Sequence, residues 1–266
     1  MDDLLLLNKL KKIDDLNFGT TSYVYPEDIL PNVILLADRV DEIELILFES
    51  PDYSNLPDKE TMDKLIKISK IYDLEYNVHL PIDIKLLSDD YKIRKRAIEN
   101  LKCVYDKSLI LNPLSYTFHF EDYNEQLYKK YSKSIIKQLK EVFTKDIKIC
   151  LENTDKYFNR FATDFINEGF NVCIDIGHII KSGENISDYL SRYDGFVKII
   201  HFHGVKNGKD HQSISNIDLK TIDMILNFAK RNRASVIFEQ FYFNLVKESI
   251  DTIRRIYGKS TDNWWN

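Results

Sequence analysis

Short β-rich segments alternate with longer amphipathic stretches along the whole chain. Eight segments read as strands, and they recur about every 30 residues, the usual length of a strand–helix–strand unit. They are Phe18–Thr21, Glu42–Phe48, Tyr76–His79, Tyr116–His119, Lys148–Glu152, Asn171–Asp175, Lys198–His203 and Ser235–Glu239.

Three of the intervening stretches have apolar residues at three- and four-residue steps. Pro57–Tyr72, Tyr123–Phe143 and Asp218–Lys230 are therefore predicted to be helices packed on a sheet. Because no Pro/Gly-rich linker interrupts the alternation, we expect an α/β fold with a single (β/α)8 TIM barrel over residues 1–258 and a loose tail over residues 259–266. A doubly wound open sheet is the rival, but no Gly-rich phosphate turn follows the first strand.

Composition and charge narrow the class of protein. The chain has 266 residues, 44% of them hydrophobic, which predicts a packed core. Its net charge of −5 argues against general binding to a nucleic-acid backbone. Apolar runs fall short of the roughly 18 residues of a membrane span, and the N-terminus has no basic leader, so we expect a cytoplasmic protein without a membrane partner. Three cysteines are too few for a disulfide framework, which agrees with a reducing compartment.

Side chains that can bind metal gather at the predicted strand ends. Chance would place about one of the six histidines there, because strand ends are a small part of such a chain. Active sites of these barrels lie at the C-terminal ends of the strands, so we expect the candidates to meet at one mouth. The candidates at or just beyond strand ends are His79, His119, Glu152, Asp175, His178, His201, His203, Asp210, His211 and Glu239.

The acidic candidates predict bound cations. Four carboxylates in one cleft, those of Glu152, Asp175, Asp210 and Glu239, would repel one another, and burial would favour their protonation. Divalent cations remove that conflict. Imidazole mixed with carboxylate suits zinc, manganese or iron better than calcium.

The alternation of side chains along the strands does not decide which histidine of the seventh strand is the ligand, but it places two cysteines inside the barrel. His201 and His203 have equal parity on the seventh strand, so both face the interior and either one could be the ligand. Cys150 and Cys173 share the inward parity of Glu152 and Asp175, two residues deeper, and we interpret them as core-filling side chains.

These residues resemble the xylose-isomerase-like barrels, and specifically their apurinic-site endonuclease branch. The resemblance covers the chain from about Phe18 to Phe241 and rests on His79, His119, Glu152, Asp175-x-x-His178, His201, Asp210-His211 and Glu239, in that order. It implies a cluster of two or three divalent ions that cleaves a phosphodiester. One departure concerns the seventh strand, where His203-Gly204 follows His201, whereas the endonucleases have a single histidine.

A narrower resemblance is to the cobamide-remodelling phosphodiesterases. It rests on Gly19-Thr20-Thr21-Ser22-Tyr23, Val78-His79-Leu80-Pro81, Cys173-Ile174-Asp175-Ile176-Gly177-His178 and the stretch from His201 to Val205. It implies a small-molecule corrinoid substrate, a vitamin B12-type cobamide. Hydrolysis of its nucleotide loop would release cobinamide phosphate and the α-riboside of the lower base.

We assign roles to the candidates on this basis. The ligands of two or three ions would be His79, His119, Glu152, Asp175, His178, His201, Asp210, His211 and Glu239, with Glu152 bridging. Glu152, Glu239, His178 and His211 are the expected catalytic residues, and Tyr23, Glu49 and His203 are expected to bind substrate or ion.

Three alternatives stay open at this point. A sugar isomerase or epimerase would use one ion and two acid/base groups. A DNA repair endonuclease would show salt-dependent DNA binding, which the acidic balance does not favour. A non-catalytic corrinoid-binding barrel would bind tightly without forming product.

Overall fold

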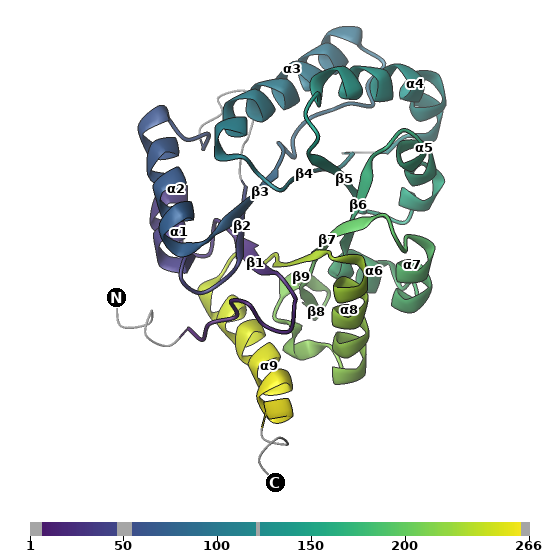
Figure 1. Cartoon of the computed structure of the whole chain (residues 1–266). Coiled ribbons are helices and arrows are strands. Elements are labelled where there is room, and N and C mark those ends of the chain that lie inside the picture. The colour runs from purple at the N-terminus through teal and green to yellow at the C-terminus, as the bar shows by residue number, and fades with distance from the viewer. Residues whose placement is uncertain (1–6, 47–54, 121–122, 262–266) are drawn as a thin grey trace.

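The computed structural model describes residues 7–46, 55–120 and 123–261. Within them, eight parallel strands close into one barrel in the order β1-β10-β7-β6-β5-β4-β3-β2, with helices around the outside (Figure 1). The barrel strands are β1 (Phe18–Thr21), β2 (Glu42–Leu45), β3 (Glu75–His79), β4 (Ser115–Phe118), β5 (Lys148–Glu152), β6 (Asn171–Asp175), β7 (Val197–His201) and β10 (Ser235–Phe238). The expected single (β/α)8 barrel is confirmed.

The outer layer consists of α-helices with short 3₁₀ turns between some of them. The α-helices are α1 (Ile29–Leu36), α2 (Lys59–Tyr72), α3 (Tyr91–Ser108), α4 (Glu125–Val142), α5 (Ala162–Asn167), α6 (Ile176–Ser182), α7 (Ile186–Arg192), α8 (Leu219–Asn232) and α9 (Phe243–Thr261). The 3₁₀ turns are η2 (Leu109–Leu111), η3 (Phe158–Arg160) and η4 (Ile214–Asn216). Since α9 continues to Thr261, residues 259–261 extend a helix.

Strand boundaries differ from the predicted ones mainly at the C-terminal ends. The predicted second strand runs to Phe48, whereas β2 ends at Leu45 and Phe48 lies outside the described residues. The predicted seventh strand runs to His203, whereas β7 ends at His201. Phe202 N still bonds Ile237 O at 2.8 Å, but the chain then turns into a hairpin of β8 (Gly204–Lys206) and β9 (Lys209–Gln212). Its turn residues Asn207 and Gly208 have φ of 54° and 74°, which suits a tight hairpin.

The core has an outer and an inner part. Outward-facing strand residues such as Ile43 and Leu45 pack beneath the helices in the main apolar cluster. The barrel interior holds a small cluster, Cys150, Cys173, Ile199 and Ile237, all buried. Both cysteines are therefore core side chains, as expected.

Polar groups also fill the barrel. Strand β2 directs Glu42 and Glu44 inward, and both are fully buried. Glu42 accepts from Asn77 Nδ2 at 2.6 Å and from Ser235 Oγ at 2.8 Å, so it has partners from β3 and β10. Burial raises the pKa of Glu42 despite these hydrogen bonds. An inward carboxylate below the mouth is thus satisfied by neutral donors.

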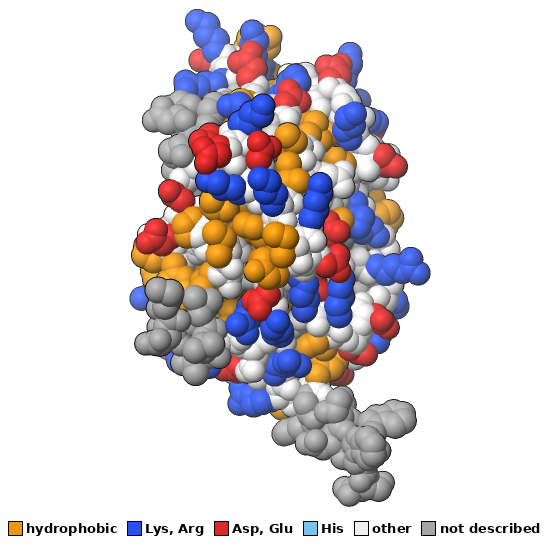
Figure 2. Space-filling view, turned by 60° about the vertical axis from the view of Figure 1, so that its left-hand side comes forward, with side chains coloured by type: hydrophobic (Ala, Val, Ile, Leu, Met, Phe, Trp, Pro, Cys, Tyr) orange, Lys and Arg blue, Asp and Glu red, His pale blue; other side chains and the backbone are white. Residues whose placement is uncertain are grey.

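The outer surface is highly charged. Lys and Arg side chains are interspersed with Asp and Glu over the face shown in Figure 2. In the part of the chain that the structure describes, no helix combines the length and apolar character needed to cross a membrane.

Candidate metal centre

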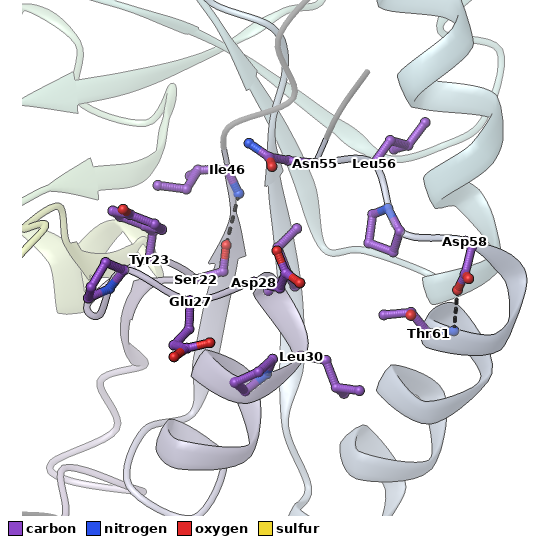
Figure 3. A pocket seen from close by; sticks show the side chains of 14 residues that line it. Ser22, Tyr23, Glu27, Asp28, Leu30, Ile46, Asn55, Leu56, Asp58 and Thr61 are labelled. Atoms are coloured by element: carbon purple, nitrogen blue, oxygen red, sulfur yellow. Dashed lines mark hydrogen bonds between the residues drawn. The ribbon is translucent and has the colours of Figure 1, made fainter. Parts of the chain in front are cut away.

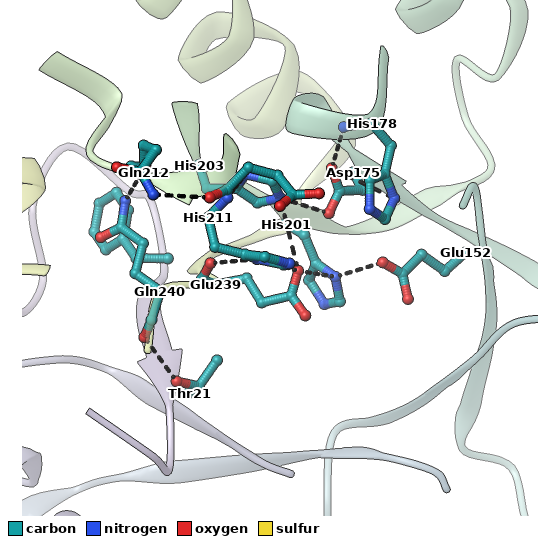
Figure 4. A network of polar contacts seen from close by, with 12 residues as sticks. Thr21, Glu152, Asp175, His178, His201, His203, His211, Gln212, Glu239 and Gln240 are labelled. Carbon is teal, nitrogen blue, oxygen red and sulfur yellow. Dashed lines mark hydrogen bonds and ion pairs between the residues drawn. The ribbon is translucent and has the colours of Figure 1, made fainter. Parts of the chain in front are cut away.

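Glu152 lies between two histidines at the mouth of the barrel. One carboxylate oxygen, Oε2, is 3.0 Å from His79 Nε2, and the other, Oε1, is 3.0 Å from His201 Nδ1. The three residues end β3, β5 and β7, and barrel closure brings them together (Figure 4 shows Glu152 and His201). Glu152 can therefore contribute one carboxylate oxygen to a ligand group on each of its sides.

His119 completes a group on the His79 side. It follows β4, and its ring centroid is 5.5 Å from that of His79. One ligand atom each from His79, His119 and Glu152 lies within 4.8 Å of the others. Burial lowers the pKa of His119 to about 4, so this imidazole is neutral near pH 7. Its buried Nδ1 has no hydrogen-bond partner among the described residues, which leaves a lone pair for a ligand.

A second group lies on the other side of Glu152. Glu152, Asp175, His201 and Glu239 have ligand atoms within 4.8 Å of one another, and all four residues are buried. Glu239 Oε2 is 3.4 Å from His201 Nδ1 and accepts no hydrogen bond from any described residue. This donor set of three carboxylates and one imidazole suits zinc or manganese.

A third group is less buried than the second. His178, on the first turn of α6, and the hairpin residues Asp210 and His211 bring ligand atoms within 4.8 Å of one another. His178 Nδ1 is 2.9 Å from Asn153 O, and His211 Nδ1 is 3.0 Å from Glu239 O. Asp210 Oδ2 also accepts from Lys181 Nζ at 2.6 Å, so a lysine cation neutralises this carboxylate.

The pKa values of the buried acids and histidines are shifted in different directions. Burial opposes ionisation of Glu152, but the neighbouring His201 and His79 hold the pKa of this carboxyl well below its usual range. Burial likewise opposes the charged form of His79, yet Glu152 raises its pKa to about 9. For Glu239, burial prevails over the attraction of His201 and raises the pKa to about 7.

The residues fit divalent cations. Buried His119 Nδ1 and Glu239 Oε2 have no hydrogen-bond partner in the described chain, and such groups are costly unless a ligand satisfies them. The raised pKa values of His79, His201 and Glu239 favour protons on these groups in the ion-free protein, and cations could take their place. His79 and His119 with Glu152, and Asp175, His201 and Glu239 with Glu152, would hold two ions.

The structure brings together every ligand expected from the sequence. Each belongs to at least one of the three groups described above. His203 and Cys173 belong to two further groups, His203 with His211 and Glu239, and Cys173 with Glu152 and His201. Cys173 is fully buried with a thiol pKa well above its usual range because of burial. It lies close to Glu152 and His201, inside the barrel as its parity predicted.

Tyr23, another expected site residue, follows the C-terminal end of β1. Tyr23 lines a cavity of about 720 Å³ between the first turns of α1 and α2, with Ser22, Glu27, Asp28 and Asp58 among its other lining residues (Figure 3). None of the described lining residues is Lys, Arg or His. Glu49 lies outside the described residues.

Sequence reasoning missed two residues that contact the centre. Glu44 Oε2 is 3.0 Å from His201 Nε2, and both side chains are fully buried. Asn153 holds Asp175 by two bonds, to its backbone N at 2.7 Å and its backbone O at 3.0 Å. The alternation of Glu42-Ile43-Glu44-Leu45 carries a signal, because a strand with apolar residues on its helix-facing side must direct both glutamates into the barrel.

Together, the closed parallel barrel and a mouth lined by imidazoles and carboxylates define a TIM-barrel protein with a candidate metal centre. A family model described as the xylose isomerase-like TIM barrel matches residues 39–256, and the chain belongs to this family. No curated protein matches it. The narrower resemblance to the cobamide-remodelling phosphodiesterases stays a prediction.

Solved structures share this fold at low sequence identity. A D-tagatose 3-epimerase-like protein has a TM-score of 0.71 and 18% identity, over 94% of this chain and 100% of the other. D-Psicose 3-epimerase from Clostridium cellulolyticum H10 has a TM-score of 0.68 and 13% identity, over 92% of each chain. The IOLI protein, solved with a zinc atom, has a TM-score of 0.66 and 15% identity, over 93% and 97%.

Proposed function

We propose that the protein is a metal-dependent phosphodiesterase that hydrolyses the nucleotide loop of a cobamide. The observation that carries the proposal is the extent of the donor set. Three groups run from His119, just after β4, to His211 on the β8–β9 hairpin, and they contain more imidazoles and carboxylates than one ion can use. Such a set suits two or three ions acting on a phosphoryl group.

Divalent ions bound here would acidify water and stabilise charge on phosphoryl oxygens. The chain's own residues would orient the substrate. Although burial opposes its charged form, the carboxylates of Asp175 and Glu152 raise the pKa of His178. At the rim this imidazole would either hold a third ion with Asp210 and His211 or contact the phosphoryl group directly. Tyr23 and the adjoining cavity of about 720 Å³ offer space for the remainder of a large substrate.

The cavity's lining supports a neutral substrate body with hydrogen-bond donors. Glu27, Asp28 and Asp58 would repel an anionic group, whereas carboxamide N–H groups such as those around a corrin ring could donate to them. The loop sequence that resembles the cobamide enzymes, Gly19-Thr20-Thr21-Ser22-Tyr23, ends at this cavity.

A one-ion sugar epimerase is the second candidate, and the solved relatives favour it over the phosphodiesterase. Two of the structures described above are named as sugar 3-epimerases or as similar to one. Glu152, Asp175, His201 and Glu239 form a compact group that could hold a single ion. In that reading, His79, His119 and the hairpin residues would have no ion to bind.

One experiment separates the candidates. Protein loaded with zinc or manganese is incubated in parallel with a cobamide, with a panel of ketohexoses and with an abasic-site DNA duplex, and products are identified by mass spectrometry and chromatography. Cobinamide phosphate supports the proposal. Epimerised ketohexose, nicked DNA, or tight cobamide binding without product would each overturn it in favour of the corresponding alternative. Glu152→Gln in each assay controls for contaminating activities.

A further inference from the structure

His203 has both ring nitrogens engaged by the protein. The side chain is fully buried below the hairpin. Its Nε2 is 2.9 Å from Asp175 Oδ2, and its Nδ1 is 2.9 Å from the backbone N of His211 (Figure 4). One ring therefore connects a β6 carboxylate to the β8–β9 hairpin, which carries Asp210 and His211.

The contact with His211 fixes the position of the ring hydrogen. A backbone N–H is always a donor, so Nδ1 of His203 must accept and cannot carry a hydrogen itself. The hydrogen of the neutral ring is then on Nε2, which donates to Asp175. Gly204 O is 3.3 Å from Nδ1, but bonding to it would require a second hydrogen facing the His211 N–H. The contact with the His211 N–H is the shorter of the two, and its donor is fixed, so Nδ1 of His203 is the acceptor.

His201 has the opposite arrangement. Its Nδ1 faces the centre, 3.0 Å from Glu152 and 3.4 Å from Glu239. Its Nε2 is 3.0 Å from Glu44 Oε2, an ion-pair distance at which neither atom makes a hydrogen bond with the described residues. Nδ1 is hydrogen-bonded to Glu152, so an ion bound by Glu152 and Glu239 would take the place of the Nδ1 hydrogen. The charge of Glu44 behind the ring then favours the remaining hydrogen on Nε2.

We propose that His201 alone is the ion ligand of the seventh strand and that His203 is a positioning residue, which ties Asp175 to the β8–β9 hairpin. This inference rests on the part of the proposed function that both candidates share, the binding of an ion by Asp175. It is independent of the substrate.

Gly177 holds the His203 ring in this position. A Cβ at residue 177 would overlap the ring atoms of His203, so the first turn of α6 needs glycine here. On its hairpin side the ring lies against that of His211, with centroids 4.3 Å apart. Packing on these two sides keeps Nε2 directed at Asp175.

Ion binding by three variants tests the assignment. His201→Gln, His203→Gln and His203→Leu are compared with the unaltered protein for zinc content after dialysis, for zinc affinity against a competing chelator, and for melting temperature. We expect His201→Gln to lose an ion. His203→Leu should keep the full zinc content at saturation with affinity about 10- to 100-fold weaker, the usual effect of losing a group that orients a ligand. His203→Gln, whose amide can still donate to Asp175, should restore most of that loss.

Two outcomes would overturn the assignment. One is loss of an ion from His203→Gln equal to the loss from His201→Gln. The other is unchanged affinity in a folded His203→Leu.

A spectroscopic test does not depend on any variant folding. In ¹⁵N-imidazole spectra of the protein loaded with ¹¹³Cd, we expect cadmium coupling at His201 Nδ1 and a protonated, uncoupled Nε2 at His203. Coupling at His203 Nε2 would overturn the inference while leaving the metal centre intact. An unaltered protein that binds no ion would instead refute the ion-dependent function proposed above.

Discussion

At the scale of single residues, Glu152 has the most connected position in the centre. Its two oxygens contact His79 and His201, and it belongs to both of the buried ligand groups on its sides. These contacts follow from strand order, because only β4 separates β5 from β3 and only β6 separates β5 from β7 around the mouth.

Replacing Glu152 by Gln should remove the bridging charge while keeping the side chain's volume. We expect ion content to fall and kcat/KM to drop at least about 100-fold, because both groups lose a ligand. Metal analysis and turnover of the identified substrate measure the effect. Glu42→Gln is the matched control, since Glu42 is an equally buried glutamate whose partners are the neutral Asn77 and Ser235. Equal losses in the two variants would contradict a special role for Glu152.

A second residue-scale prediction concerns Gly177. Gly177→Ala adds one methyl group against the His203 ring and touches no proposed ligand. Because the ring must move away from Asp175, zinc affinity should weaken by about 10-fold. Chelator competition measures this, with Ser182→Ala on the same helix as the control. Unchanged affinity in a folded Gly177→Ala would show that the ring position does not matter to the ion.

At the scale of elements, the sequence predicted some parts well and others not at all. The strands Phe18–Thr21, Lys148–Glu152 and Asn171–Asp175 agree with β1, β5 and β6. In β5 and β6 the signal is a compact apolar run, as buried strands of a parallel barrel have. The helices α5, α6 and α7 have six or seven residues, too few for an apolar period to emerge. The β8–β9 hairpin is signalled only by Asn207-Gly208, yet it delivers Asp210 and His211.

The hairpin provides a prediction that separates the two candidate functions. Asp210→Asn removes the only carboxylate of the third group, His178, Asp210 and His211. It leaves the second group, Glu152, Asp175, His201 and Glu239, unchanged. A phosphodiesterase that uses this group should lose roughly 100-fold in kcat, because the third ion would lose a ligand and its charge would no longer stabilise the phosphoryl oxygens. A one-ion epimerase should be almost unaffected.

Lys181→Met is the control for the Asp210 variant. It breaks the 2.6 Å ion pair with Asp210 but removes no proposed ligand. Steady-state rates of both variants, measured on the substrate that the product assay identifies, decide between the candidates. Full phosphodiesterase activity in Asp210→Asn would remove the third group from the mechanism.

At the scale of the whole molecule, the convergence of distant residues could be predicted, whereas their pairing could not. The histidines and acids that follow the strands meet because the parallel strands close on themselves. Which nitrogen of His201 or His203 faces the centre depends on Glu44 and on the His211 backbone. Those contacts come from strand register and from the course of a hairpin, neither of which a residue pattern specifies.

The pH dependence of stability should reveal how far ions replace protons in the buried centre. His79 has its pKa raised to about 9 by Glu152 against the effect of burial, and Glu239 has its pKa raised to about 7 by burial. A histidine with a raised folded pKa stabilises the ion-free protein fully below pH 6.5, and this contribution is lost as pH rises through about 9. The protonated Glu239 acts in the same direction, because its contribution is lost between its unfolded value and about 7.

Bound ions reverse this trend, because protons must leave His79 before it can be a ligand, and apparent affinity then rises with pH. We therefore expect the melting temperature of chelator-treated protein to fall as pH rises from 6.5 to 9. The difference in melting temperature between ion-loaded and chelator-treated protein should increase over the same range. Calorimetry of both forms at these two pH values measures the gap, and Glu152→Gln should show little of it. A gap that narrows with rising pH would mean that the protons on His79 and Glu239 are not what the ions displace.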